Sequence, residues 1–149
     1  MLILRKNDRY KIMKKTIIAA FIGLALSSCS DTKKQEKDLL DNILKVHDKV
    51  MGNDEALMKN KMQLDSLLKL PAKDTAEKVN MKALDLKLVA AEEAMENWMH
   101  KFEPDVTGKS HDEIMNYYNS QKKGIMSVDS QINVAVTESN KYLSNKLKK

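Results

Sequence analysis

Cysteine, proline and glycine are all scarce in this chain of 149 residues. It has one cysteine, two prolines and four glycines, and aromatic residues make up 5% of it. A single cysteine excludes an intramolecular disulfide and a cysteine-rich zinc site. The low glycine and proline content excludes a collagen-like chain, and the isolated glycines exclude a glycine-rich phosphate loop. Leu, Ala, Met, Lys, Asp and Glu dominate after residue 29, a composition typical of long helices.

The net charge of +5 comes entirely from residues 1–29. This segment contains one acid, Asp8. Its bases are Arg5, Lys6, Arg9, Lys11, Lys14 and Lys15. From residue 30 onwards the acidic and basic residues balance. Nucleic-acid binding relies on an excess of Lys and Arg, so we predict no nucleic-acid partner.

The N-terminal segment has the parts of a secretory signal peptide in order. Lys14 and Lys15 precede an apolar run over residues 17–26, and small residues follow it. The run is too short to span a bilayer comfortably, which takes about 20 residues. We therefore predict a signal peptide over residues 1–28. We expect translation to start at Met13, which gives a compact Met-Lys-Lys signal.

Leu26, Ser27, Ser28 and Cys29 resemble the lipobox of bacterial lipoproteins. The resemblance implies diacylglyceryl transfer to the Cys29 sulfur, cleavage before Cys29, and acylation of the new N-terminus, typically with palmitate. A thiolate is the strong nucleophile that this thioether chemistry needs, and more than one acyl chain gives stable anchoring. The alternative is an unmodified cysteine after an ordinary signal peptide.

Residues 29–35 are polar and lack apolar periodicity, so we predict a lipidated tether. Among bacterial lipoproteins, Ser30 rather than Asp after the lipidated cysteine implies the outer membrane. We therefore expect a lipid-anchored protein of the bacterial cell envelope, on the periplasmic or the surface side.

Three long helices are predicted, over residues 36–70, 75–102 and 111–147. Each has apolar residues at alternating steps of three and four. The first row is Leu40, Ile43, His47, Val50, Asp54, Leu57, Lys61, Leu64 and Leu68, widened by Leu44, Met51 and Met58. The second is Met81, Leu84, Leu88, Ala91, Met95, Trp98 and Phe102. The third is Ile114, Tyr118, Gln121, Ile125, Val128, Ile132, Ala135, Ser139 and Tyr142.

The helix boundaries follow from capping and breaking residues. Pro71 ends the first helix. Asp74 with Glu77, and Ser110 with Glu113, have the spacing of a capping box. Glycine weakens a helix interior by ~1 kcal/mol relative to alanine. We therefore expect a kink at Gly52, or a break that restarts with Asn53 as the cap.

Long helices with short connections predict an all-α fold. We expect an elongated, antiparallel three-helix bundle over residues 36–149, with coiled-coil-like packing. A two-helix hairpin with a separate third helix is the alternative, and the sequence leaves the oligomeric state open.

The residues that suggest a metal site are methionines and one histidine. His47, Met51, Met58 and Met62 share one helix face, and Met95 with Met99 lies near the expected antiparallel partner segment. Imidazole and thioether ligands suit copper(I). The favoured interpretation is that these methionines fill an irregular core.

Two further groups have a structural and a functional interpretation. Glu92, Glu93 and Glu96 are either paired carboxylates for acid–base chemistry or a solvated helix face. Residues 98–102 are either core packing with an exposed edge or an aromatic anchor for a partner. The structural interpretation is favoured for both, since no partner nucleophile or binding loop accompanies them. We predict that the protein is not an enzyme and binds no cofactor.

Residues 46–52 (Val-His-Asp-Lys-Val-Met-Gly) and 91–102 (Ala-Glu-Glu-Ala-Met-Glu-Asn-Trp-Met-His-Lys-Phe) resemble motifs of small Bacteroidota lipoproteins often labelled "viral A-type inclusion protein". The label reflects helical, coiled-coil-like composition and implies no viral role. The resemblance implies location and fold, and it supplies no activity or site residues. The sequence thus predicts a lipid-anchored, non-enzymatic interaction or structural module with an envelope protein partner. The alternative is a copper-binding envelope protein using His47, Met51, Met95 and Met99.

Overall fold

A computed structural model describes residues 31–71 and 74–147. The chain divides into two compact units, residues 1–38 and 39–149. The signal peptide, Leu26, Ser27, Ser28 and Cys29 lie outside the described residues, so the interpretations of them stay predictions.

Residues 31–38 of the first unit are helical. The tether predicted at residues 29–35 is therefore helical where it is described. Gln35 Nε2 donates to Asp31 Oδ2 at 3.3 Å, and Lys34 Nζ lies 3.5 Å from Asp38 Oδ2. These pairs are four residues apart, and with the helix-favouring Lys, Gln and Glu residues they support helix despite the lack of apolar periodicity.

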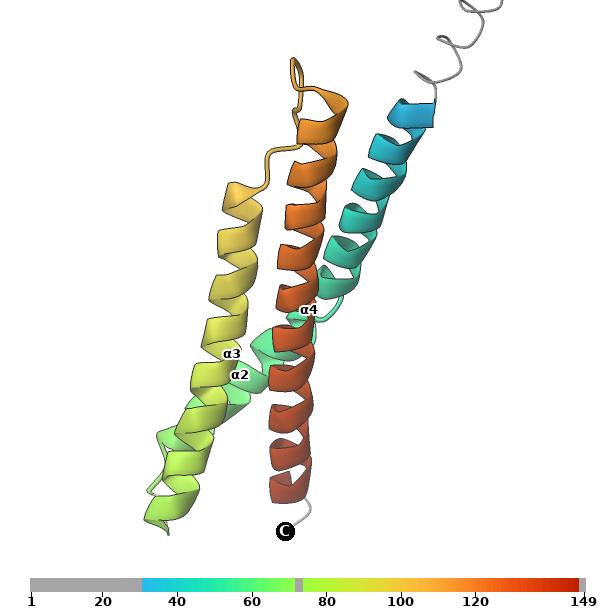
Figure 1. The fold of residues 1–149 in the computed structure, drawn as a ribbon. Coiled ribbons are helices and arrows are strands. Elements are labelled where there is room, and N and C mark those ends of the chain that lie inside the picture. Colours follow the sequence, from blue (N-terminus) through green and yellow to red (C-terminus); the bar gives the residue numbers. More distant parts are fainter. Residues whose placement is uncertain (1–30, 72–73, 148–149) are drawn as a thin grey trace, which may run out of the picture. The chain divides into compact units, whose positions relative to one another are not determined.

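The second unit is a bundle of α-helices (Figure 1). Residues 39–51 are helical and are followed by α2 (Asp54–Leu68), α3 (Thr75–Lys101) and α4 (His111–Leu147). Each of α2, α3 and α4 contacts the other two, and α3 runs antiparallel beside α4. The described residues contain no strand, and none of their helices has the length and apolar character needed to cross a bilayer. The all-α helical bundle is confirmed, and its coiled-coil geometry stays a prediction.

Gly52 and Asn53 interrupt the first predicted helix. The Gly52 N–H still donates to the Asp48 carbonyl at 3.0 Å, whereas the Asn53 N–H donates to Val50, only three residues back, at 2.9 Å. The Asn53 backbone keeps right-handed helical angles, and its side chain makes no capping bond to α2. Its amide donates instead to Asn133 Oδ1 on α4 at 3.2 Å. The interruption is thus a kinked joint, and a tertiary contact occupies the side chain expected to cap.

The core of the second unit follows the predicted apolar rows. The rows of α3 and α4 are buried along most of their length, with Phe102 at the margin. The fully buried large side chains include Ile43, Val50, Leu57, Leu64, Leu88 and Ile125. Burying one such side chain fully contributes about 1.5–3 kcal/mol to folding.

Leu44, Met51 and Met58, predicted to widen the first row, are instead exposed. They directly follow the core residues Ile43, Val50 and Leu57 in sequence, and each step along a helix turns the side chain by about 100°. Residues 39–51 and α2 together form the first helical arm, and α3 and α4 both lie on the side of this arm that carries the core residues. The single-residue offset therefore places the three side chains on the outer surface.

The ends of α3 and α4 are capped largely as predicted. The Asp74 side chain accepts a hydrogen bond from the Ala76 N–H at 2.9 Å, and Ser110 with Glu113 forms a complete capping box. Glu77, expected to complete the box of α3, accepts a hydrogen bond from the Tyr142 hydroxyl on α4 at 3.1 Å and is paired with Lys146. Its carboxylate thereby ties the start of α3 to the end of α4.

Trp98 holds α3 and α4 at close range. Its indole N–H donates to the Gln121 carbonyl at 3.2 Å. A Cβ atom at Gly124 would lie 3.1 Å from Trp98 Cδ1. Glycine at this position therefore lets the Cδ1–Nε1 edge of the indole approach the α4 backbone.

We expect Gly124→Val to destabilise the bundle by about 1–3 kcal/mol, because overpacking forces the indole or the helix to shift. Urea denaturation followed by the fluorescence of Trp98, the chain's single tryptophan, measures the change. Ser120→Val, one turn earlier at an exposed position of α4, is the matched control. Equal stability of the two variants would contradict the close packing.

Candidate functional site

The segments that carry the predicted metal ligands are neighbours in the bundle. The His47 ring lies 5.9 Å from the Trp98 ring between centroids, tilted by 33°, which places residue 47 beside the Met95–Met99 stretch of α3. His47 Nδ1 is 3.2 Å from Asp48 Oδ1. Met95 is buried, whereas Met51 and Met99 are each 41% exposed. The thioethers are thus divided between core and surface, and copper binding stays a prediction.

No group of three or more His, Cys, Asp or Glu side chains within residues 31–71 and 74–147 is placed to hold a metal ion.

The aromatic residues around Trp98 form a continuous stack. Trp98 and Phe102 stack at 4.9 Å, and Phe102 and Tyr117 at 6.5 Å, between ring centroids. The Tyr117 hydroxyl accepts a hydrogen bond from the Glu103 N–H at 2.6 Å, which ties the α3–α4 loop to α4. Trp98 is buried, which confirms the interpretation of residues 98–102 as core packing with an exposed edge. The alternative of an exposed aromatic anchor does not fit this burial.

One residue of the acidic run on α3 (Glu92, Glu93 and Glu96) forms an ion pair with a lysine of α2. Lys61 Nζ lies 2.5 Å from Glu92 Oε2, with both side chains about three-quarters buried. The hydrogen bond to Glu92 raises the pKa of Lys61, although burial acts in the opposite direction. Glu93 and Glu96 are exposed. Glu93 and Glu96 thus lie on the solvated face that the structural interpretation predicts, whereas Glu92 departs from it as a largely buried ion-pair partner of α2.

Asn60 and Asp85 are buried polar residues that the predicted rows did not include, whereas Ser139 is a buried member of the predicted third row. The Asn60 amide donates to Ser139 Oγ at 2.8 Å and to Asn140 Oδ1 at 2.9 Å, and Ser139 Oγ donates to the Ala135 carbonyl at 2.7 Å. Asn60 lies between Leu57 and Leu64, at the spacing of a core residue, and that spacing was the available signal. Its donors are matched by acceptors on α4, so this group is a satisfied link between two helices.

Asp85 is the buried polar residue with an unsatisfied atom. The residue is 5% exposed, and its Oδ1 has no hydrogen-bond partner among the described residues. Its Oδ2 accepts from Lys82 Nζ at 3.2 Å. A buried carboxylate oxygen without a partner costs free energy, because it has lost its hydration.

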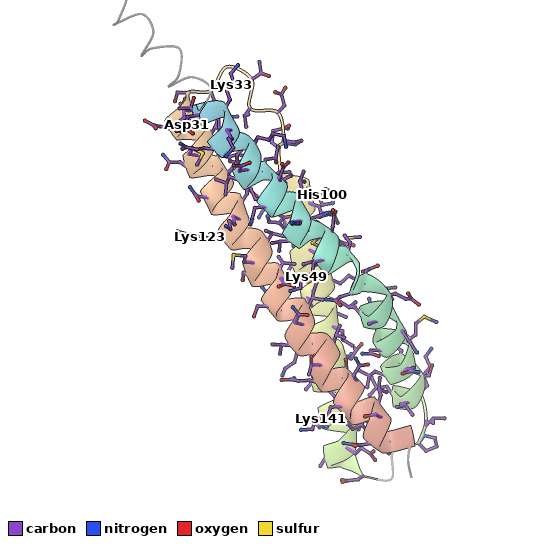
Figure 2. All side chains as sticks on the ribbon, turned by 90° about the vertical axis from the view of Figure 1, so that its right-hand side faces the viewer. Asp31, Lys33, Lys49, His100, Lys123 and Lys141 are labelled. Atoms are coloured by element: carbon purple, nitrogen blue, oxygen red, sulfur yellow. The ribbon has the colours of Figure 1, made fainter. Side chains whose placement is uncertain are left out.

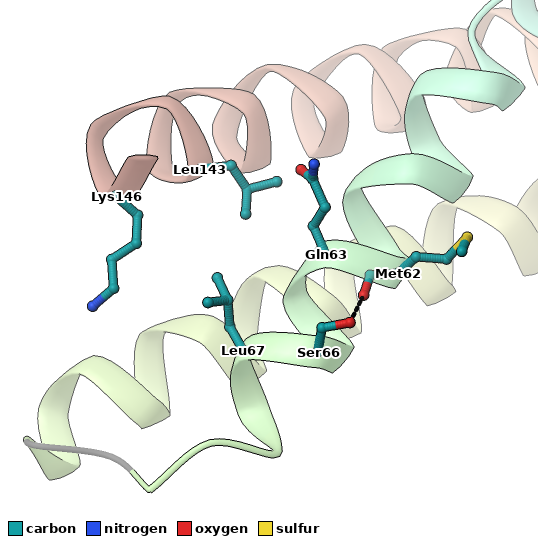
Figure 3. A pocket seen from close by; sticks show the side chains of 6 residues that line it. All are labelled: Met62, Gln63, Ser66, Leu67, Leu143 and Lys146. Carbon is teal, nitrogen blue, oxygen red and sulfur yellow. Dashed lines mark hydrogen bonds between the residues drawn. The ribbon is translucent and has the colours of Figure 1, made fainter. Parts of the chain in front are cut away.

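An apolar groove of about 350 Å³ lies between the C-terminal turns of α2 and α4. Figure 3 shows Leu67 and Leu143 at its centre, Gln63 and Lys146 at its edges, and the Met62 thioether extending away from it along the outside of α2. Ser66 takes no part in the polar rim, since its hydroxyl donates to the Met62 carbonyl at 2.8 Å. The groove therefore offers apolar contact and few polar groups that would orient a small ligand.

Comparison with known proteins gives no relative. No protein-family model, no curated protein and no solved structure matches this chain.

We expect Asp85→Leu to raise the free energy of unfolding by about 1–3 kcal/mol, because an apolar side chain removes a buried carboxylate with one oxygen unpaired. Urea denaturation measures the change. Glu93→Leu, at an exposed site on α3, is the control and should stay within about 0.5 kcal/mol of wild type. A less stable Asp85→Leu variant would show that the carboxylate has a stabilising partner such as a bound water.

The link between Glu77 and Tyr142 predicts a pH effect. Burial, and then the bond to Glu77, raises the pKa of Tyr142 above its ordinary value of 10.0. Folding thus favours the neutral phenol, and this contribution to stability is complete below pH 10 and lost as the pH rises through the folded pKa. Glu77→Gln should lower the Tyr142 pKa without returning it fully to 10.0, since burial remains.

Absorbance at 295 nm during an alkaline titration follows the phenolate, and Tyr142→Phe identifies which transition belongs to Tyr142. An unchanged transition in Glu77→Gln would contradict the hydrogen bond.

Proposed function

We propose that this chain is a lipid-anchored protein of the bacterial cell envelope and that its helical bundle is a non-enzymatic interaction module. The observation that carries the proposal is the order of basic residues, apolar run, Leu26-Ser27-Ser28 and Cys29 at the N-terminal end. The position of the chain's single cysteine at the end of this pattern supports lipidation over an incidental thiol. The resemblance to Bacteroidota lipoproteins favours the same location, and Ser30 in place of Asp after the cysteine favours the outer membrane as the destination.

The surface of the bundle supports an interaction role. Apolar side chains are exposed on the arm formed by residues 39–51 and α2, and α2 and α4 enclose an apolar groove. Exposed apolar surface of this kind commonly marks contact with another protein. The proposed partner is another component of the envelope.

We expect wild-type protein to incorporate an alkyne-tagged palmitate in growing cells and Cys29→Ala to lose the label and to keep its signal peptide. Removing the thiol removes the atom to which the diacylglyceryl group would be attached, and cleavage follows that step. Gel fluorescence after tagging, with the intact mass of the purified protein, measures both effects.

Ser30→Ala is the matched control, because it alters the adjacent residue and keeps the thiol. Equal labelling of Cys29→Ala and wild type, or an unlabelled wild type, would contradict the anchor.

A further inference from the structure

One face of the first helical arm carries a regular apolar row that the bundle does not cover. We call Leu44, Met51, Met58 and Met62 the outer row; their spacings are seven, seven and four residues. Their exposed fractions are 41%, 41%, 38% and 66%. The outer row crosses the joint at Gly52 and Asn53, so it lies on two helical segments, residues 44–51 and 54–62, of about 11 Å and 12 Å at 1.5 Å per residue.

The spacing is that of a helix–helix contact. Isolated exposed apolar residues are common and need no explanation, but a row at heptad intervals aligns one face of a helix with a second helix. Residues 39–51 and α2 run side by side with α4, and α3 lies behind them in Figure 2. The outer row is turned by about 100° from the core row of Ile43, Val50 and Leu57, which leaves its side chains 38–66% exposed.

The outer row is bordered mainly by acidic side chains. Between residues 41 and 65, the charged residues within about 80° of the row, at 100° per residue, are mostly acidic. The acidic ones are Asp41, Asp48, Asp54, Glu55 and Asp65, and the basic one is Lys59. Of the other lysines in residues 39–68, Lys45 lies about 100° from Leu44 around the helix, Lys49 pairs with Asp129 on α4 at 2.8 Å, and Lys61 pairs with Glu92 on α3.

We propose that the outer row is the docking face for a basic amphipathic helix of another protein. This inference rests on the proposed function and names the chemistry of the partner. Methionine side chains are flexible and polarisable, and they suit the apolar face of an incoming helix. Lys or Arg residues flanking that face would meet Asp48 and Glu55 on one border and Asp54 and Asp65 on the other.

The charge pattern selects this occupant over two others. A second copy would set one acidic border against another, and like charges across an interface are unfavourable. An anionic membrane surface would be repelled by the same carboxylates. The opposite charge on a helical partner removes both conflicts.

The probe is a fluorescein-labelled synthetic helix of about three heptads, with Leu on one face and Lys on both flanks. A second peptide has Glu in place of each Lys. The mature lipidated protein, held in phosphatidylcholine nanodiscs, is titrated against each peptide by fluorescence anisotropy, with empty nanodiscs as the blank. We expect the Lys peptide to bind, the Glu peptide to bind at least about tenfold more weakly, and added salt to weaken the Lys peptide.

Two double variants separate the apolar and the charged contributions. Met51→Ser with Met58→Ser, and Asp48→Asn with Glu55→Gln, should each weaken the Lys peptide about tenfold or more. The matched control is Val79→Ser with Leu86→Ser on α3, another exposed apolar pair seven residues apart. The control should bind as wild type does.

Several outcomes would overturn the proposal. These are equal binding of the Lys and Glu peptides, equal loss in the α3 control, or unchanged binding in the methionine double variant. Self-association of wild type that the methionine double variant abolishes would assign the face to a second copy instead. Cys29→Ala should bind the peptide as wild type does, so failure of the lipid anchor and failure of this docking face are distinguishable.

Discussion

No helix of this bundle can bury its apolar side alone, and the rest of the structure depends on the convergence of one apolar row from each. Isolated helices are marginal in water, so tertiary packing supplies most of their stability. Trp98 shows how close that packing is: its indole lies between the His47 ring and Phe102 and contacts α4 at Gly124. One side chain thus helps to set the distances of α3 to both neighbours.

Much of the fold was predictable, because alternating steps of three and four and the capping residues are local signals. Ser110 and Glu113 marked the start of α4, and Pro104 and Gly108 lay in the loop before it. What could not be predicted depends on the direction from which neighbours approach. The row of Ile43 and the row of Leu44 have equal heptad spacing, and only the positions of α3 and α4 decide which is buried. The burial of Asp85 likewise depends on a neighbouring helix that the local pattern does not place.

The candidate site was less predictable than the fold. The sequence placed His47 near the Met95 segment, and the structure agrees, but it could not tell which methionines face the core. Met95 packs inside while Met51 is exposed, so the predicted ligand set includes a core residue and a surface residue. The surface methionines, like the proposed lipid anchor, are available for contacts made by the exterior of the bundle.

The hydrogen-bonded group of Asn60, Ser139 and Asn140 discriminates against misaligned folds. Sliding α2 by one turn along α4 would bring Ala56 or Leu64 to the place of Asn60 and bury the Asn60 amide among apolar groups. A purely apolar seam would tolerate that slip with little loss, whereas an unpaired buried amide makes it costly. The polar group therefore widens the energy gap between the native alignment and its nearest competitors, which keeps a bundle of repetitive rows in one arrangement.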